Sequence, residues 1–192
     1  MIKVALVGTG GMGTVHYHNY AHIDGCEVTA LVDVTEKSRE NADEWGLPLY
    51  PDIAAMAADQ QVDVVDICTP TFLHKQHVMQ ALSLGFHAIT EKPIALHKKD
   101  ALEMVALADQ KGKQLFVAQV LQFTKEVEVL RSLVQSHEYG KPLDAHFERL
   151  SACPRWLWCA LLQSPLDCVA SFRSCWRTAA TRPWTSPALR PT

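Results

Sequence analysis

The chain has 192 residues, of which 48% are hydrophobic and 20% charged, and its formal net charge is −3. That composition supports a hydrophobic core and excludes a wholly disordered chain. The lack of a basic excess argues against a nucleic-acid-binding protein. No apolar run approaches the roughly 18 residues of a membrane span, and the short apolar N-terminus does not fit a secretory signal, so we expect a cytoplasmic protein.

Short apolar runs alternate with helical stretches over most of the chain. Strands are expected at residues 2–7, 27–32, 47–50, 62–67, 86–90 and 114–120. Helices are expected at residues 11–23, 35–45, 51–57, 73–84, 97–110 and 124–137, with Pro51 in the first turn of the third. This alternation predicts βαβ units, and therefore an α/β fold with a doubly wound parallel sheet of the Rossmann type.

A glycine-rich loop, Gly8-Thr9-Gly10-Gly11-Met12-Gly13, joins the first expected strand to the first helix and matches the pattern G-x-G-x-x-G. In such a loop Gly8 permits the tight turn, Gly10 lets the backbone approach a pyrophosphate, and Gly13 lets the helix pack close to the strand. The helix N-terminus adds free N–H groups and the positive end of the helix dipole. We therefore expect these six residues to bind the diphosphate of a dinucleotide cofactor.

Asp33 follows the second expected strand, 20 residues after Gly13. A carboxylate at that place bonds the ribose 2′-hydroxyl of NAD and would repel the 2′-phosphate of NADP. No arginine follows directly, since Arg39 lies within the next expected helix. NAD is thus favoured over NADP as the cofactor. A methyltransferase also pairs a glycine-rich loop with an acid on the second strand, so that alternative stays open.

Two further motifs follow neighbouring strands: Cys68-Thr69-Pro70, with His74 downstream, and Glu91-Lys92-Pro93. Because ligands of parallel sheets bind outside the carboxyl ends of the strands, both motifs should face one crevice. Burial and a nearby nicotinamide cation would disfavour the charged form of Lys92, which could then exchange a proton with a substrate hydroxyl. The alternative is a solvated Lys92 paired with Glu91.

The combined pattern resembles the glucose–fructose oxidoreductase, inositol dehydrogenase and MocA (Gfo/Idh/MocA) family over about residues 1–155. The residues that carry the resemblance are Gly8–Gly13 followed by His16, Asp33, Thr69-Pro70 with His74, Glu91-Lys92-Pro93, Val117–Phe123 and Gly140-Lys141-Pro142. The resemblance implies an NAD(P)-dependent oxidoreductase that transfers a hydride between a nicotinamide cofactor and a hydroxyl-bearing carbon of a sugar, inositol or related polyol.

The same resemblance implies roles for individual residues. Lys92 corresponds to the catalytic lysine, and Glu91 is a contact near the nicotinamide. Thr69 and Pro70 would flank the cofactor, His74 would lie near its ribose, and Pro93 would follow a cis peptide bond. No metal site is expected, because the histidines on the first helix lack the glutamate of an H-E-x-x-H motif.

Two features depart from the family pattern. Gln122 stands where members commonly have arginine, and the second catalytic motif, an Asp and a His a few residues apart, is not found after Trp156. We therefore expect an NAD(P)-binding Rossmann domain at 1–121, a linker helix and the start of a substrate domain at 122–155, and an irregular tail at 156–192. The alternative function is a nucleotide-binding module without turnover. Family members often associate through the open face of the second domain's sheet, which this sequence lacks, so a homo-oligomer is left as an open expectation.

The end of the chain differs sharply in composition from the rest. Residues 151–192 hold five basic residues and one acidic residue, against 13 and 20 in residues 1–150, and they contain four of the six cysteines. Their prolines would interrupt helices and strand ladders. We interpret this segment as a shifted reading frame or an altered terminus. The alternative is a genuine but irregular extension rich in tryptophan.

Overall fold

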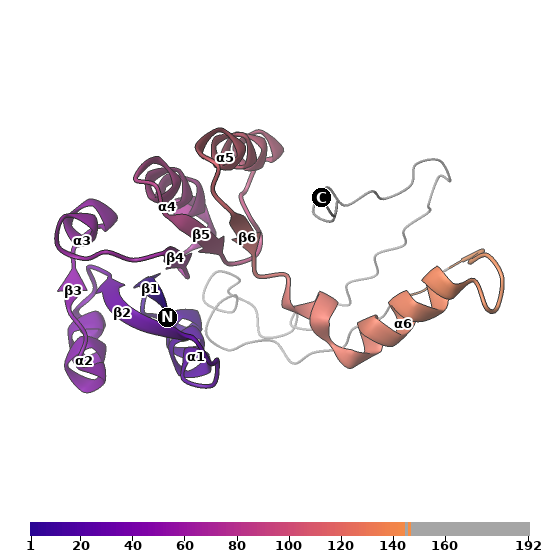
Figure 1. The fold of residues 1–192 in the computed structure, drawn as a ribbon, viewed down its shortest axis with the longest axis horizontal. Coiled ribbons are helices and arrows are strands. Elements are labelled where there is room, and N and C mark those ends of the chain that lie inside the picture. Colours follow the sequence, from indigo (N-terminus) through magenta and orange to yellow (C-terminus); the bar gives the residue numbers. More distant parts are fainter. Residues whose placement is uncertain (145, 147–192) are drawn as a thin grey trace, which may run out of the picture. The chain divides into compact units, whose positions relative to one another are not determined.

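The computed structural model describes residues 1–144 and 146, and the chain divides into two compact units, Met1–Thr124 and Lys125–Thr192. The first unit contains a six-stranded parallel sheet (Figure 1). Its strands are β1 (Ile2–Val7), β2 (Cys26–Val32), β3 (Leu49–Tyr50), β4 (Val64–Ile67), β5 (His87–Thr90) and β6 (Leu115–Val117). The strand order β3-β2-β1-β4-β5-β6 is that of a doubly wound Rossmann sheet, which confirms the expected fold class.

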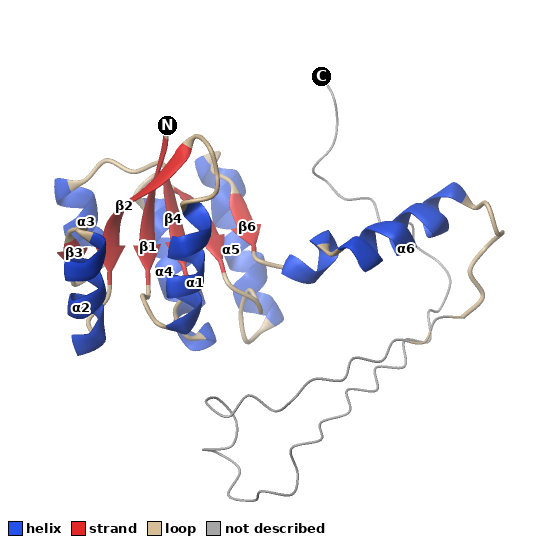
Figure 2. Ribbon diagram, turned by 90° about the horizontal axis from the view of Figure 1, so that it is seen from below, coloured by secondary structure: helices blue, strands red, loops and turns tan. Residues whose placement is uncertain are grey.

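Helices cover both faces of this sheet. Figures 1 and 2 show α1 (Gly11–Tyr20) and α2 (Glu36–Trp45) on one face. The other face carries α3 (Ile53–Asp59), α4 (Thr71–Ser83) and α5 (Lys98–Lys111). This arrangement follows because βαβ crossover connections share one hand. Helices that connect strands toward the β3 side of β1 therefore lie on one face of the sheet, and helices that connect strands toward the β6 side lie on the other.

The strands divide their side chains between two hydrophobic clusters. In β1, Ala5 and Val7 belong to the larger cluster, which also contains residues of α3, α4 and α5, whereas Leu6 belongs to the smaller one with residues of α1 and α2. Burial on both faces explains why the strands are nearly continuous apolar runs in the sequence. Asp66 of β4 breaks that pattern, because it is 0% exposed between the two apolar residues Val65 and Ile67.

Several element boundaries differ from the sequence-based expectation by a few residues, and two of them have a clear local cause. Helix α3 begins at Ile53 rather than at Pro51, because the Asp52 side chain caps it by accepting a hydrogen bond from the Ala55 N–H at 2.7 Å. The last strand ends at Val117, the residue that pairs with Thr90 at the end of β5. Residues 120–123, beyond the reach of that pairing, form the 3₁₀ helix η1 (Val120–Phe123).

The second unit begins with α6 (Lys125–Ser136), which agrees closely with the helix expected there. Residue 145 and residues 147–155 of the expected start of a substrate domain, and the whole tail at 156–192, lie outside the described residues, so the three-segment division stays a prediction. No helix within residues 1–144 is both long and apolar enough to cross a membrane.

Candidate functional site

The candidate site lies at the carboxyl ends of the strands, where the topology changes direction. The chain passes from β1 to β2 and β3 on one side of the sheet and continues through β4, β5 and β6 on the other. Loops therefore diverge between β1 and β4, and such switch points form crevices in open parallel sheets. A cavity of about 500 Å³ lies there. Its lining includes Gly8, Gly10, Val32–Thr35, Pro51–Ile53, Cys68–Pro70 and four residues of α4, namely Leu73, Gln76, His77 and Gln80.

The three motif glycines of the loop meet different surroundings. A Cβ on Gly13 would lie 1.9 Å from the carbonyl oxygen of Gly8, so only glycine allows this close packing of α1 on the loop. Gly8 has a φ of +87°, and a Cβ there would lie 3.0 Å from Cγ2 of Thr69. A Cβ on Gly10 would have nothing within 4 Å. Two glycines thus shape the loop, and the third leaves open space beside the cavity.

The N-terminus of α1 carries unused hydrogen-bond donors. No side chain caps this end, and the Thr14 N–H makes the first helical bond, to the Gly10 carbonyl at 2.8 Å. The N–H groups of Gly11, Met12 and Gly13 have no acceptor among the residues that the structure describes. These amides and the helix dipole fit the diphosphate of a dinucleotide.

Asp33 borders the cavity with its carboxylate already oriented. Its Oδ2 accepts hydrogen bonds from the Thr9 N–H at 2.7 Å and the Thr9 hydroxyl at 3.0 Å, and its Oδ1 accepts the Thr35 N–H at 2.9 Å. Burial raises the pKa of Asp33, but the hydrogen bonds from Thr9 and Thr35 outweigh burial and hold that pKa below its usual value. An ionised carboxylate held in this way can accept a ribose hydroxyl at the unused lone pair of Oδ1.

Thr69 and Pro70 line the cavity, as expected for residues that flank a cofactor. The Thr69 hydroxyl lies 3.2 Å from Nδ1 of His77, which also lines the cavity. Burial, followed by the effect of His74, lowers the pKa of His77 below its usual value. The neutral ring that results is able to accept the hydroxyl proton of Thr69.

His74 does not line the cavity. Its ring is 1% exposed, and Nδ1 and Nε2 each lie 2.9 Å from a backbone carbonyl oxygen, that of Pro93 and that of Thr69 respectively. The ring therefore joins the loop after β4 to the loop after β5. Its contact with a cofactor ribose stays a prediction.

Glu91 and Lys92 follow β5 and lie in contrasting surroundings. Glu91 is 6% exposed, and its Oε2 accepts the backbone N–H of Lys92 at 3.0 Å. The Lys92 side chain is exposed, so the expected burial is not found, and no described residue bonds its amine. The ion pair between the two side chains, considered as an alternative, is also not found within residues 1–144. The Lys92–Pro93 peptide bond is cis, as the resemblance implied.

A polar cluster lies beneath the Glu91 loop, on the face covered by α1. Nδ1 of His16 lies 2.8 Å from Oδ2 of Asp66, and Nε2 lies 3.1 Å from Oε1 of Glu91. The Tyr20 hydroxyl donates to the same Asp66 oxygen at 2.9 Å. The Cys68 thiol lies 3.3 Å from Nδ1 of His16. These short contacts join the side chains directly, so the group is a hydrogen-bonded cluster.

The electrostatics of this cluster favour a charged histidine. The hydrogen bond to Asp66 raises the pKa of His16; burial opposes this, but the negative charges of Asp66 and Glu91 add to the rise. Burial and the nearby carboxylates also raise the pKa of both the Cys68 thiol and the Tyr20 phenol, so both stay neutral near pH 7. In the sequence His16 follows the glycine loop, a position that fits either contact with the cofactor or packing in the core. An acid inside the apolar strand Val64–Ile67 was the available signal for Asp66.

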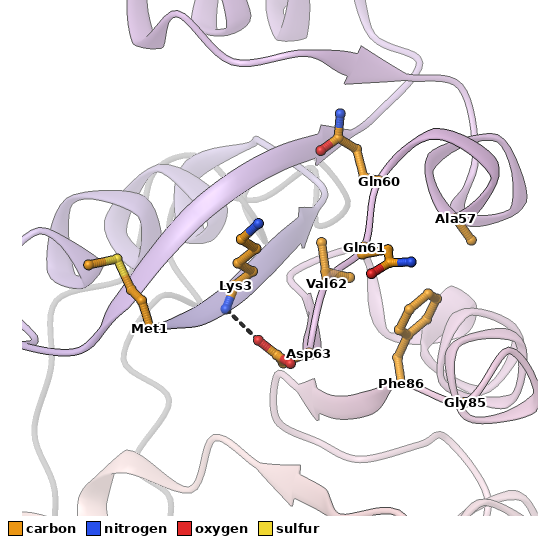
Figure 3. A pocket seen from close by; sticks show the side chains of 9 residues that line it. All are labelled: Met1, Lys3, Ala57, Gln60, Gln61, Val62, Asp63, Gly85 and Phe86. Atoms are coloured by element: carbon orange, nitrogen blue, oxygen red, sulfur yellow. Dashed lines mark hydrogen bonds between the residues drawn. The ribbon is translucent and has the colours of Figure 1, made fainter.

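A second cavity, of about 550 Å³, lies at the opposite edge of the sheet (Figure 3). It is lined by residues at the amino ends of strands, including Lys3, Asp63 and Phe86. Figure 3 shows the Lys3 backbone N–H donating to the Asp63 carboxylate, at 2.8 Å. None of the motif residues lines this cavity, so we place the candidate site at the carboxyl edge.

The glycine loop, the oriented acid and the strand order are those of an NAD-binding Rossmann domain. Residues 2–119 match the sequence model of a family described as an oxidoreductase family with an NAD-binding Rossmann fold, GFO_IDH_MocA. The chain belongs to the Gfo/Idh/MocA family. The resemblance stated from the motifs is thereby confirmed, and so is the NAD cofactor expected for this Gfo/Idh/MocA chain.

Individual relatives agree with this assignment. The chain is 34% identical over 142 residues to a D-apiose dehydrogenase from Paraburkholderia graminis, which covers 73% of this chain and 38% of the relative. It is 31% identical over 154 residues to an inositol 2-dehydrogenase from Arthrobacter, covering 77% of this chain and 45% of the relative. The chain thus spans less than half the length of these relatives.

Solved structures show the same similarity. A probable dehydrogenase from Thermotoga maritima superposes with a TM-score of 0.74 at 28% identity, covering 80% of this chain and 47% of that one. The WlbA dehydrogenase from Bordetella pertussis, solved in complex with NADH and UDP-GlcNAcA, gives a TM-score of 0.69 at 25% identity, covering 72% and 43%. These similarities agree with the Rossmann topology of the first unit.

Proposed function

We propose that the cavity at the switch point binds NAD through the residues expected from the sequence. The N–H groups at the start of α1 hold the diphosphate, and Asp33 accepts a hydroxyl of the adenosine ribose. The observation that carries this proposal is the Asp33 carboxylate, held by Thr9 and Thr35 at the border of a cavity of about 500 Å³. The open space at Gly10 leaves room for the diphosphate to approach the backbone.

We further propose that the chain takes part in catalysing the oxidation of a hydroxyl-bearing carbon in a sugar, inositol or related polyol. The D-apiose and inositol dehydrogenases among its relatives support this substrate class. NAD, when bound, supplies the acceptor for the hydride. Lys92 accepts the proton in its neutral form, which the positive nicotinamide of bound NAD would favour. Its Nζ takes up the hydroxyl proton as the same carbon loses its hydride, and in the reverse direction it returns that proton to the carbonyl oxygen. Its exposed amine at the carboxyl edge is free to reach a substrate.

A second candidate is a nucleotide-binding module without turnover. It is supported by residues 156–192, which do not contain the Asp and His motif that the family resemblance implies. A polyol substrate needs contacts on more than one side for its carbon to be positioned against a nicotinamide. Residues beyond the first unit would have to supply the remaining contacts.

Two measurements on the purified chain separate these candidates. Fluorescence titration with NADH tests cofactor binding, and absorbance at the NADH band tests reduction of NAD in the presence of inositol and several sugars. Binding and polyol-dependent reduction together support the oxidoreductase. Binding without reduction by any polyol supports the module, and absence of binding overturns both.

The variant Lys92→Met tests whether Lys92 accepts the hydroxyl proton. We expect it to abolish polyol-dependent reduction while NADH binding persists. Lys98→Met, which removes another exposed lysine at the start of α5, is the matched control and should retain both properties. If Lys92→Met still reduced NAD with a polyol at the rate of the unaltered chain, Lys92 would have no role in the proton transfer.

A further inference from the structure

His16 links the cofactor helix to the loop that carries Lys92. It lies on α1, three residues after Gly13, so its backbone belongs to the helix that presents the diphosphate-binding amides. Its side chain reaches two buried acids, Asp66 of β4 and Glu91 at the end of β5. The second oxygen of Glu91 accepts the backbone N–H of Lys92 at 3.0 Å. A continuous set of hydrogen bonds therefore runs from α1 to the Lys92 backbone.

This set of bonds is complete only when His16 carries both of its ring protons. Nδ1 faces a carboxylate oxygen of Asp66 and Nε2 faces one of Glu91, and neither oxygen of an ionised acid has a proton to donate. A neutral ring has a single N–H, so it would leave one nitrogen lone pair against a carboxylate. The protonated ring donates to both acids and compensates buried negative charge.

The other groups that face the ring do not supply that charge. Tyr20 of α1 is a donor to Asp66, and the Cys68 thiol after β4 lies 3.9 Å from the second oxygen of Asp66. Both are neutral near pH 7, since burial raises the pKa of each. The upward shift in the pKa of His16 agrees with this geometry.

The position of the cluster relates it to one half of the cofactor. Asp33, which we assign to the adenosine ribose, lies after β2 on one side of β1, and the diphosphate amides lie directly after β1. The rest of a dinucleotide must then extend to the other side of β1, over β4 and β5. Glu91 and Lys92 lie at the end of β5, beside the nicotinamide half.

We infer that protonated His16 is a positioning residue, which holds Glu91 and the Lys92 backbone in place and so shapes the nicotinamide end of the cofactor site. This inference rests on the proposed binding of NAD. It predicts that the loss of the His16 charge affects the nicotinamide half of the cofactor and spares the adenosine half.

The test compares two ligands on the full chain, NADH and ADP-ribose, which lacks the nicotinamide ring. His16→Asn should weaken NADH binding by about tenfold and change ADP-ribose binding by less than about twofold. His22→Asn makes the same chemical change at an exposed position after α1 and should leave both affinities unchanged. Equal losses for both ligands in His16→Asn, or no loss for NADH, would overturn the inference.

A second readout uses the unaltered chain and needs no variant to fold. The ratio of NADH affinity to ADP-ribose affinity should fall as pH rises through the pKa of His16, and NMR titration of the imidazole should show both ring protons at pH 7. A neutral His16 at pH 7, or a ratio independent of pH from 6 to 9, contradicts the inference and leaves NAD binding intact. If neither ligand binds the unaltered chain, the proposed function fails and this inference fails with it.

Discussion

Thr9 and Asp33 join the glycine loop to the end of β2 through two hydrogen bonds to one carboxylate oxygen. The Thr9 N–H lies 2.7 Å from Oδ2 of Asp33, and the Thr9 hydroxyl lies 3.0 Å from the same atom. Thr9 is 1% exposed, so neither donor is exchanged readily for water. The acid that we assign to the ribose is therefore oriented before a nucleotide binds, which lowers the entropy lost on binding.

Removal of the Thr9 hydroxyl should weaken this link. We expect Thr9→Val to destabilise the fold by about 1.5 kcal/mol, the lower end of the range for a hydrogen bond to a charged group, and to weaken NAD binding. Thr9→Ser keeps the hydroxyl and should retain most of the affinity. Urea unfolding and NADH titration measure the two effects. A Val variant as stable and as tight-binding as the Ser variant would show that the backbone N–H alone orients Asp33.

Asp33 should determine the choice between NAD and NADP. Asp33→Ala removes the acceptor for the ribose hydroxyl and the charge that repels a 2′-phosphate. We expect weaker NAD binding and a shift of about tenfold in the ratio of NADP to NAD affinity. Asp33→Asn separates charge from shape, because it retains an acceptor oxygen. An unchanged cofactor preference in both variants would refute the role of Asp33.

Alanine substitutions at Gly10 and at Gly13 should have different effects. Gly13→Ala places a methyl group 1.9 Å from the Gly8 carbonyl oxygen, so it should lower the free energy of unfolding whether or not a ligand is bound. Gly10→Ala meets nothing within 4 Å and has a φ of −68°, so its fold should be intact. Because that methyl group occupies the approach to the diphosphate, NAD binding should be weakened. Thermal unfolding and ligand titration of both variants test this contrast.

His16 should make stability depend on pH in a defined direction. Its pKa is raised in the folded chain, so its contribution to the free energy of unfolding is fully present below pH 6.5 and is lost as pH rises through the folded pKa. The stability difference between the unaltered chain and His16→Asn should accordingly shrink from pH 6 to pH 9. Urea unfolding across this range measures it. A difference that stays constant with pH would mean that His16 packs as a neutral ring.

Asp52 should stabilise α3 through its capping bond to Ala55. We expect Asp52→Ala to cost about 1 kcal/mol in the free energy of unfolding, and Asp52→Asn to cost less because the amide oxygen still caps the helix. Chemical denaturation of the pair gives the comparison. Equal stability of the Ala variant and the unaltered chain would exclude a capping role.

The sequence by itself determined the parallel α/β fold, the glycine loop and the acid after β2. These features are local: apolar runs, turn glycines and the spacing from Gly13 to Asp33 lie within single βαβ units. The family motif also implied the cis bond before Pro93. The cofactor side of the site was therefore predictable, whereas the start of α3 was missed because an Asp cap competes with a first-turn proline.

Only the tertiary structure decided how distant polar residues combine. Asp66 and Glu91 lie 50 and 75 residues after His16 in the sequence. The three side chains meet because β1, β4 and β5 are successive neighbours beneath α1. Strand order likewise buries His74 between two loop carbonyls and leaves Lys92 exposed. Residue type says that a side chain can hold a proton, but strand pairing and burial decide which charges surround it.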